Sequence, residues 1–274
     1  MTAQPVVAVV APLTGPRAAW GAVLLSQVEQ VRAMGTGAVE WHVHDETPGA
    51  TDAVAVGGYA AVIGHSDVSA ARDALPAYRA AGLVCLLPFV QAGGCALSWM
   101  PDTDALARAI IEGASALGAG TLSVVHGDGD GWPELARQVG EEAAAAGLES
   151  GGSAALAVLA PQDRFARLVA VTDVRGPVLT VADCGLGSFA ALAEAARDRT
   201  VWAVHPQMCA VRRARTAVTA LAQALVDAPA VRGHALSAAV RARSGVLLAA
   251  GGGVVGDGWR VSRLHVVCPA RDPH

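Results

Sequence analysis

A chain of 274 residues, of which 53% are hydrophobic and 16% charged, can bury a complete core and forms either one large domain or two smaller lobes. This composition excludes intrinsic disorder, and a net charge of −4 with no basic stripe beyond Arg212–Arg215 argues against a nucleic-acid partner. No apolar run reaches the roughly 18 residues that a membrane-spanning helix needs, so we expect no membrane insertion.

The chain contains neither lysine nor asparagine and is rich in Ala, Arg, Val and Gly, as expected for a GC-rich, actinobacterial-like genome. Without lysine, a pyridoxal-phosphate Schiff base and a phosphate-loop lysine are both excluded. The first residues, Met1 to Pro5, carry no basic segment and no cleavage site, so we expect a cytoplasmic protein. Five widely spaced cysteines without a Cys-x-x-Cys pair favour reduced thiols, and we expect no cofactor and no metal.

Short apolar runs alternate with longer segments of helical period, a pattern typical of βαβ units and an α/β fold with parallel sheets. Strands are predicted over 6–11, 39–43, 60–63, 83–87, 122–125, 155–159, 178–181 and 201–204. Helices are predicted over 17–34, 67–81, 104–117, 133–146, 162–172 and 186–197. After Pro206 we expect two consecutive helices over 211–226 and 235–242, followed by a glycine-rich, hairpin-like tail over 245–267.

The turn after the first predicted strand runs from Pro12 to Gly21 and contains neither GxGxxG nor GK[ST]. Phosphate-binding turns use such glycines so that backbone N–H groups can approach the phosphate, and a nucleotide is therefore not expected. Ligands of α/β folds bind at the carboxyl ends of strands, which makes Trp20 a candidate ligand-stacking wall. The alternative is that Trp20 caps the core at the start of a helix.

Histidines end three predicted strands, at His44, His126 and His205, where a general base or a metal ligand is conceivable. Residues 42–46 alternate between the two faces of one strand and do not converge, which argues against a metal site there. We expect these histidines to be solvated or hydrogen-bonded.

Cys184 follows a predicted strand and precedes a helix, a placement that lowers a thiol pKa and permits a nucleophile or a base. Two-lobed cofactor-independent racemases use one cysteine from each lobe in this way, and Cys95 or Cys85 would have to be the partner. The alternative is a small buried residue. Ser66, Asp67 and Ser69 fit a helix cap better than a catalytic triad.

Several segments together resemble the type I periplasmic binding proteins of the leucine/isoleucine/valine and amide-sensor group. They are Val9–Gly21, Ala61–Ser66, Ala74–Pro88, Ser123–Trp132 and Asp163–Leu168, and they follow the family's order over about two hundred residues. The resemblance implies two lobes, each a mostly parallel sheet flanked by helices, with three crossovers and a ligand cleft between the lobes. Lobe one would comprise 1–118 plus about 209–244, and lobe two 119–208 plus about 245–274.

By position, the resemblance also implies a set of ligand-binding residues. In lobe one these are Trp20, His65, Ser66, Ser69, Phe89 and Gln91, and in lobe two Trp132, Asp183 and Gln207. The sequence departs from the family at two of them: Phe89 and its neighbours lack the small hydroxyl residues that seat a carboxylate, and Gln207 replaces the acid that binds an ammonium. A neutral amide holds an ammonium less strongly, which weakens the case for a standard amino acid.

The expected function is therefore cytoplasmic binding of a small polar metabolite, amino-acid-like or amide-like, as a sensor or carrier. An alternative is a metal- and cofactor-independent enzyme of small-molecule metabolism, such as an isomerase, lyase or hydrolase, with Cys184, Asp183, His205 and His65 as catalytic candidates. A third class is a structural pairing domain or homodimer, because the lobe-one helices of this family often dimerise.

Overall fold

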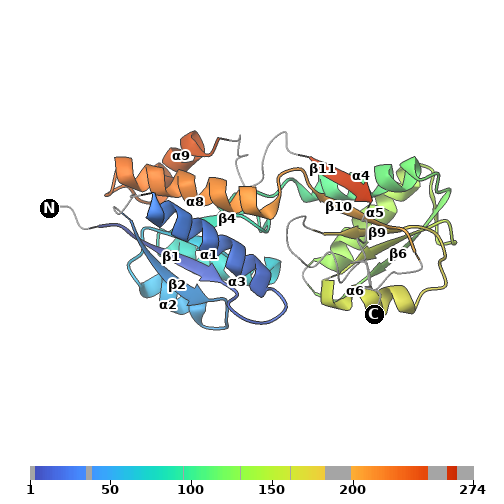
Figure 1. Cartoon of the computed structure of the whole chain (residues 1–274), viewed down its shortest axis with the longest axis horizontal. Coiled ribbons are helices and arrows are strands. Elements are labelled where there is room, and N and C mark those ends of the chain that lie inside the picture. Colours follow the sequence, from blue (N-terminus) through green and yellow to red (C-terminus); the bar gives the residue numbers. More distant parts are fainter. Residues whose placement is uncertain are drawn as a thin grey trace, which may run out of the picture. The chain divides into compact units, whose positions relative to one another are not determined.

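The computed structural model describes residues 4–34, 39–94, 96–129, 131–160, 162–182, 199–245 and 258–263. The chain divides into two compact units, drawn in Figure 1. The first unit is Met1–Asp102 with Met208–Gly258, and the second is Thr103–Gln207 with Trp259–His274. Each unit is an α/β body built around one sheet, which confirms the predicted fold class.

The first unit contains a five-stranded parallel sheet in the order β2-β1-β3-β4-β5. Its strands are β1 (Val6–Ala11), β2 (Glu40–Asp45), β3 (Ala61–Gly64), β4 (Val84–Leu87) and β5 (Leu97–Ser98). Its helices are α1 (Ala18–Ala33), α2 (Ala50–Val56), α3 (Val68–Ala80), α8 (Ala210–Asp227) and α9 (Gly233–Arg243). Helix α1 packs beside α8, α8 beside α9, and α2 beside α3. The inner strands are covered on both faces, which explains their continuous apolar sequences.

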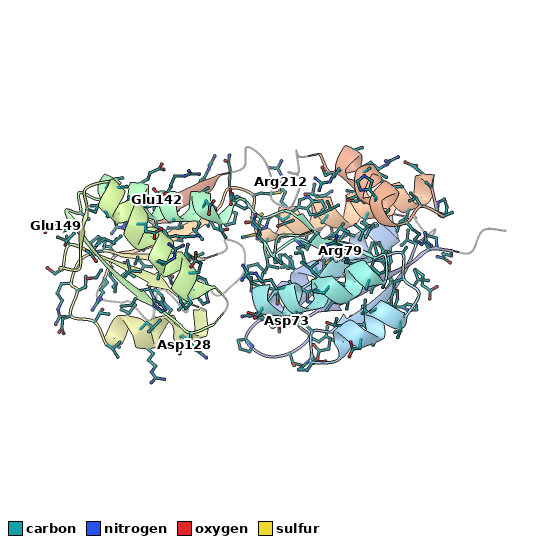
Figure 2. All side chains as sticks on the ribbon, turned by 180° about the vertical axis from the view of Figure 1, so that it is seen from behind. Asp73, Arg79, Asp128, Glu142, Glu149 and Arg212 are labelled. Atoms are coloured by element: carbon teal, nitrogen blue, oxygen red, sulfur yellow. The ribbon has the colours of Figure 1, made fainter. Side chains whose placement is uncertain are left out.

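Helix α3 shows how the helical period separates core from solvent in this unit. Ala71, Ala74 and Tyr78 are buried against the rest of the unit. Asp73 and Arg79 lie on the exposed side of the same helix, as Figure 2 shows. Because only every third or fourth residue can face the sheet, Tyr78 carries its hydroxyl group into the interior.

The second unit contains a six-stranded sheet in the order β11-β10-β9-β8-β6-β7, in which only β11 is antiparallel to its neighbour among the described strands. Its strands are β6 (Thr121–His126), β7 (Glu149–Ser150), β8 (Ala155–Leu159), β9 (Val178–Val181), β10 (Val201–Pro206) and β11 (Trp259–Arg263). Its described helices are α4 (Thr103–Ala116), α5 (Trp132–Ala145) and α6 (Gln162–Ala170). Alternate β8 residues enter two different cores: Ala157 and Leu159 pack toward α4 and α5, and Leu156 and Val158 pack toward Phe165 of α6.

The predicted strands and helices match the structure to within a residue or two at most ends. The predicted helix over 186–197 lies outside the described residues, and of the predicted tail only its first residue and 258–263 are described, the latter containing β11. Three short elements, α2, β5 and β7, were not predicted. No helix in the described part of the chain is long and apolar enough to span a bilayer.

The structure assigns α4 to the second unit, whereas the predicted boundary at residue 118 puts it in lobe one. In the structure α4 packs against α5 and the β9–β11 edge of the second sheet. Its apolar residues Leu106 and Ile110 belong to the core of that unit. Gly113 of α4 lies so close to Leu179 and Val261 that a Cβ there would approach each side chain to within about 3 Å, so the contact requires a small residue.

Candidate functional site

The candidate site lies at the carboxyl edge of the first sheet, within the first unit. Because β1 to β4 are parallel, the segments that follow them emerge at one edge. These are the turn before α1, the residues after Asp45, the loop before α3, and the loop after Leu87. Most of the ligand-binding residues implied for lobe one lie in these segments.

Two glycines allow these loops to approach the strands closely. Gly64 ends β3 with φ +147°, and a Cβ there would lie 1.9 Å from the carbonyl oxygen of Val10. Gly21 in α1 lies against the turn that follows β1, and a Cβ there would lie 2.0 Å from the carbonyl oxygen of Pro12. Both positions therefore require glycine, and the resulting contacts fix where the two loops begin.

Glu46 is the centre of the hydrogen-bond network at this edge. Its carboxylate accepts hydrogen bonds from the Ser66 backbone N–H (3.0 and 3.1 Å), the Ser66 hydroxyl (2.7 Å) and the Asp67 backbone N–H (3.4 Å). His65 Nδ1 lies 3.1 Å from the same carboxylate. The Glu46 side chain is only 8% exposed, and these donors replace the water it loses on burial.

His65 adopts φ +60° and is the only described residue other than glycine with positive φ. This conformation, which costs free energy in a residue with a side chain, turns the chain sharply after β3. It carries the imidazole inward, where the ring is buried between Glu46 and Tyr78. The strained backbone thus aims the His65 ring and the next two backbone N–H groups at Glu46.

Tyr78 fixes the arrangement of protons in this network. Its hydroxyl lies 3.1 Å from His65 Nε2, and burial, its largest influence, raises the pKa of Tyr78 above its ordinary range. The hydroxyl therefore stays protonated at neutral pH and can donate to Nε2. His65 Nδ1 then carries the proton that is donated to Glu46.

Charged residues surround this network. Asp67 caps α3 by accepting from the Ala70 backbone N–H at 2.8 Å, and its carboxylate forms an ion pair with Arg17. Asp45 accepts a hydrogen bond from the Leu13 backbone N–H at 3.0 Å, which ties the end of β2 to the turn before α1. Asp45, Glu46 and Asp67 outnumber Arg17, so these four groups carry a net negative charge.

An aromatic pair lies at the same edge. The rings of Trp20, in the first turn of α1, and Phe89, in the loop after β4, are in edge-to-face contact with centroids 5.1 Å apart. Phe89 is buried and Trp20 is partly exposed. Buried Arg213 stabilises this loop: its Nε donates to the Pro88 carbonyl at 2.8 Å, and its Nη1 donates to the Met208 carbonyl.

The remaining residues implied for lobe one are distributed differently. Ser69 is exposed on α3, and Gln91 is half-buried in the loop that carries Phe89. The structure thus brings together Trp20 with Phe89 and His65 with Ser66. Glu46, Tyr78 and Arg213, for which the sequence predicted no role, hold those residues in place.

In the second unit, Trp132 begins α5 and packs partly against the core, and its buried indole N–H has no hydrogen-bond partner among the described residues. Gln207 is exposed after β10. His205 is buried, with Nδ1 2.9 Å from the Pro206 carbonyl and Nε2 2.9 Å from the Ser262 hydroxyl of β11. Asp183, Cys184 and Cys95 lie outside the described residues.

The ring nitrogens of the two candidate histidines, His65 at the first sheet's edge and His205 on β10 of the second unit, are engaged by protein groups. His65 and His205 each have both ring nitrogens within hydrogen-bond distance of protein groups, so neither could act as a base without breaking a contact. Among the residues the structure describes, no three His, Cys, Asp or Glu side chains are grouped to hold a metal ion. What the edge offers is a partly exposed aromatic pair and a polar loop whose donors are already engaged.

The fold is that of the type I periplasmic binding proteins, as the sequence resemblance predicted. The chain is similar to an ABC transporter substrate-binding protein of Desulfitobacterium hafniense solved in complex with Leu (TM-score 0.74, 15% identity, 95% of this chain and 97% of that one). It is also similar to the leucine-binding protein LivK of Thermotoga maritima (0.72, 15%, 92% and 93%) and to a fatty acid ABC transporter substrate-binding protein of Thermomonospora curvata (0.61, 15%, 88% and 80%). No protein-family model and no curated protein matches the sequence.

Proposed function

We propose that the protein binds a small polar metabolite, amino-acid-like or amide-like, and acts as a sensor or carrier of it. The observation that carries the proposal is the Trp20–Phe89 pair at the carboxyl edge of the first sheet, where ligands of open α/β folds bind. The structural neighbours include proteins named for binding leucine and fatty acids, which supports a small organic ligand with an apolar part.

Three features of this edge support a role in recognition. Glycine contacts, a strained histidine and a buried arginine fix its loops before any ligand arrives, so little conformational entropy is lost on binding. Trp20 keeps part of its ring exposed while its position is fixed by Phe89. A rigid, partly exposed aromatic ring is the kind of residue that contributes most to binding energy.

The first test is native mass spectrometry of freshly purified protein, followed by extraction of any retained small molecule. Leucine and leucinamide are then titrated calorimetrically, together with whatever compound is recovered. Replacing Trp20 by alanine should weaken binding by about 2 kcal/mol, roughly 30-fold, because an anchoring aromatic residue is removed. Trp41→Phe is the matched control, since Trp41 is buried in β2, and its affinity should equal that of the wild type.

Unchanged affinity in a folded Trp20→Ala variant would place the binding site elsewhere. If the retained compound is recovered chemically altered or is consumed when added back, the protein is an enzyme and not a carrier. Circular dichroism and the urea midpoint of each variant establish that the fold is intact.

A further inference from the structure

The loop before α3 has the features of a carboxylate-binding seat. Two successive backbone N–H groups, those of Ser66 and Asp67, and the Ser66 hydroxyl converge on one point at the N-terminal end of a 13-residue helix. Free N–H groups and the helix dipole together favour a negative charge at such a place. The carboxyl edge of the sheet is also where a ligand would reach this loop.

A carboxylate of the protein itself already fills this seat. One oxygen of Glu46 accepts from His65 and from the Ser66 and Asp67 backbone N–H groups, and the other accepts from the Ser66 N–H and hydroxyl. With four donor groups on two oxygens and a side chain that is 8% exposed, the seat is saturated and closed. A second carboxylate arriving with a ligand would find no free N–H group in it.

The charge around the seat adds to this effect. Asp45 directly precedes Glu46 in the chain, and Asp67, whose backbone N–H donates to Glu46, is paired through its side chain with Arg17. An anionic ligand group would face uncompensated negative charge in a partly dry environment, where repulsion is stronger than in water. The Ser66 hydroxyl donates its one hydrogen bond to Glu46, and its oxygen lone pairs can still accept a hydrogen bond from a donor on the ligand.

We propose that Glu46 is a built-in substitute for a ligand carboxylate and determines specificity, so that the site selects ligands bearing an amide or ammonium group and no carboxylate. The inference rests on the proposed function and narrows its ligand class. It accounts for the absence of small hydroxyl residues in the loop after β4, which reads Pro88-Phe-Val-Gln91. A ligand without a carboxylate needs no second seat there.

The test compares leucine with leucinamide, which differ only in carboxylate against carboxamide, by calorimetry. The wild type should bind leucinamide at least about tenfold more tightly than leucine, the expected minimum for one unfavourable charge. Glu46→Ala should lose this preference or reverse it, because the vacated seat can take the leucine carboxylate. Glu40→Ala is the control, since Glu40 lies exposed at the start of β2, the strand that ends just before Glu46, and it should keep the wild-type preference.

Acetate probes the seat without any assumption about the ligand. Sodium acetate should raise the melting temperature of Glu46→Ala more than sodium chloride at equal concentration does. For the wild type and for Glu40→Ala, sodium acetate and sodium chloride should change the melting temperature by the same amount. If Glu46→Ala does not fold, Glu46→Gln serves instead: its amide still fills the seat, so leucine affinity should change no more than a few-fold.

The outcomes separate the two proposals. Leucine binding to the wild type as tightly as leucinamide overturns the role of Glu46 and leaves the proposed function standing. If neither compound nor any recovered molecule binds, the proposed function fails. The acetate experiment alone then tests whether Glu46 fills the seat. Two results would show that Glu46 does not occupy the seat. One is equal stabilisation of the wild type and Glu46→Ala by acetate, and the other is tight leucine binding by Glu46→Gln.

Discussion

Replacing Arg213 by methionine should destabilise the first unit and loosen the loop that carries Phe89. Arg213 is fully buried in α8 and donates to the carbonyl groups of Pro88 and Met208, two buried residues that are far apart in the sequence. Methionine fills most of the volume but donates no hydrogen bond. Two buried carbonyls left without a donor cost about 1–3 kcal/mol each, and removing a desolvated charge offsets part of this, so we expect a net loss of about 2–3 kcal/mol.

The assay combines urea denaturation with hydrogen exchange measured by mass spectrometry. Arg212→Met is the matched control, because Arg212 is the preceding residue on α8 and is exposed, as Figure 2 shows. Arg213→Met should lower the urea midpoint of the first unit, and peptides covering 86–92 and 207–213 should exchange faster. Equal midpoints for the two variants, or unchanged exchange in both peptides, would refute the role assigned to Arg213.

Two further predictions concern the residues behind the candidate site. Gly64→Ala should lower the unfolding free energy by roughly 3 kcal/mol or more, because its Cβ would overlap the Val10 carbonyl. Gly58→Ala is the control, since Gly58 also has a positive φ but open space around it, and its loss measures the cost of the backbone conformation alone. Equal losses in the two variants would contradict the steric contact at Gly64. Tyr78 has a folded-state pKa raised by burial, so the unfolded chain loses this proton first and wild-type stability falls as the pH rises above about 10. Tyr78→Phe lacks this titration, so its deficit in unfolding free energy relative to the wild type should shrink between pH 9 and 11, as measured by urea unfolding at each pH; a constant deficit would count against a buried, protonated Tyr78.

The long elements could be predicted because their patterns are local. The apolar run of β1 and the helical period of α3 each reflect burial that is repeated along the sequence, and the predicted ends are close to the observed ones. The short helix α2 was missed because its seven residues, between Gly49 and Gly57, are too few to show a period. Strand β7 has only two residues, both exposed, so no apolar signal marks it.

The candidate site was predictable only in part, for a different physical reason. Trp20 was proposed because it follows a strand, which is a position that sequence alone can assign, and Ser66 was implied by the family resemblance. The role of Glu46 depends on a contact across twenty residues and on the positive φ of His65, and neither leaves a pattern in the sequence. Arg213 contacts a loop 125 residues away, so its role depends entirely on tertiary structure.

The interrupted course of the chain has a consequence for how the protein is made. The first unit needs α8, residues 210–227, to cover α1, so Leu24, Val28 and their neighbours on α1 emerge from the ribosome long before their cover is synthesised. The second unit, by contrast, is nearly continuous from Thr103 to Gln207 and lacks only its last described strand, β11. During translation the middle of the protein can therefore fold before its beginning does. An apolar helix face that waits through more than one hundred residues of synthesis is a natural place for a chaperone to bind.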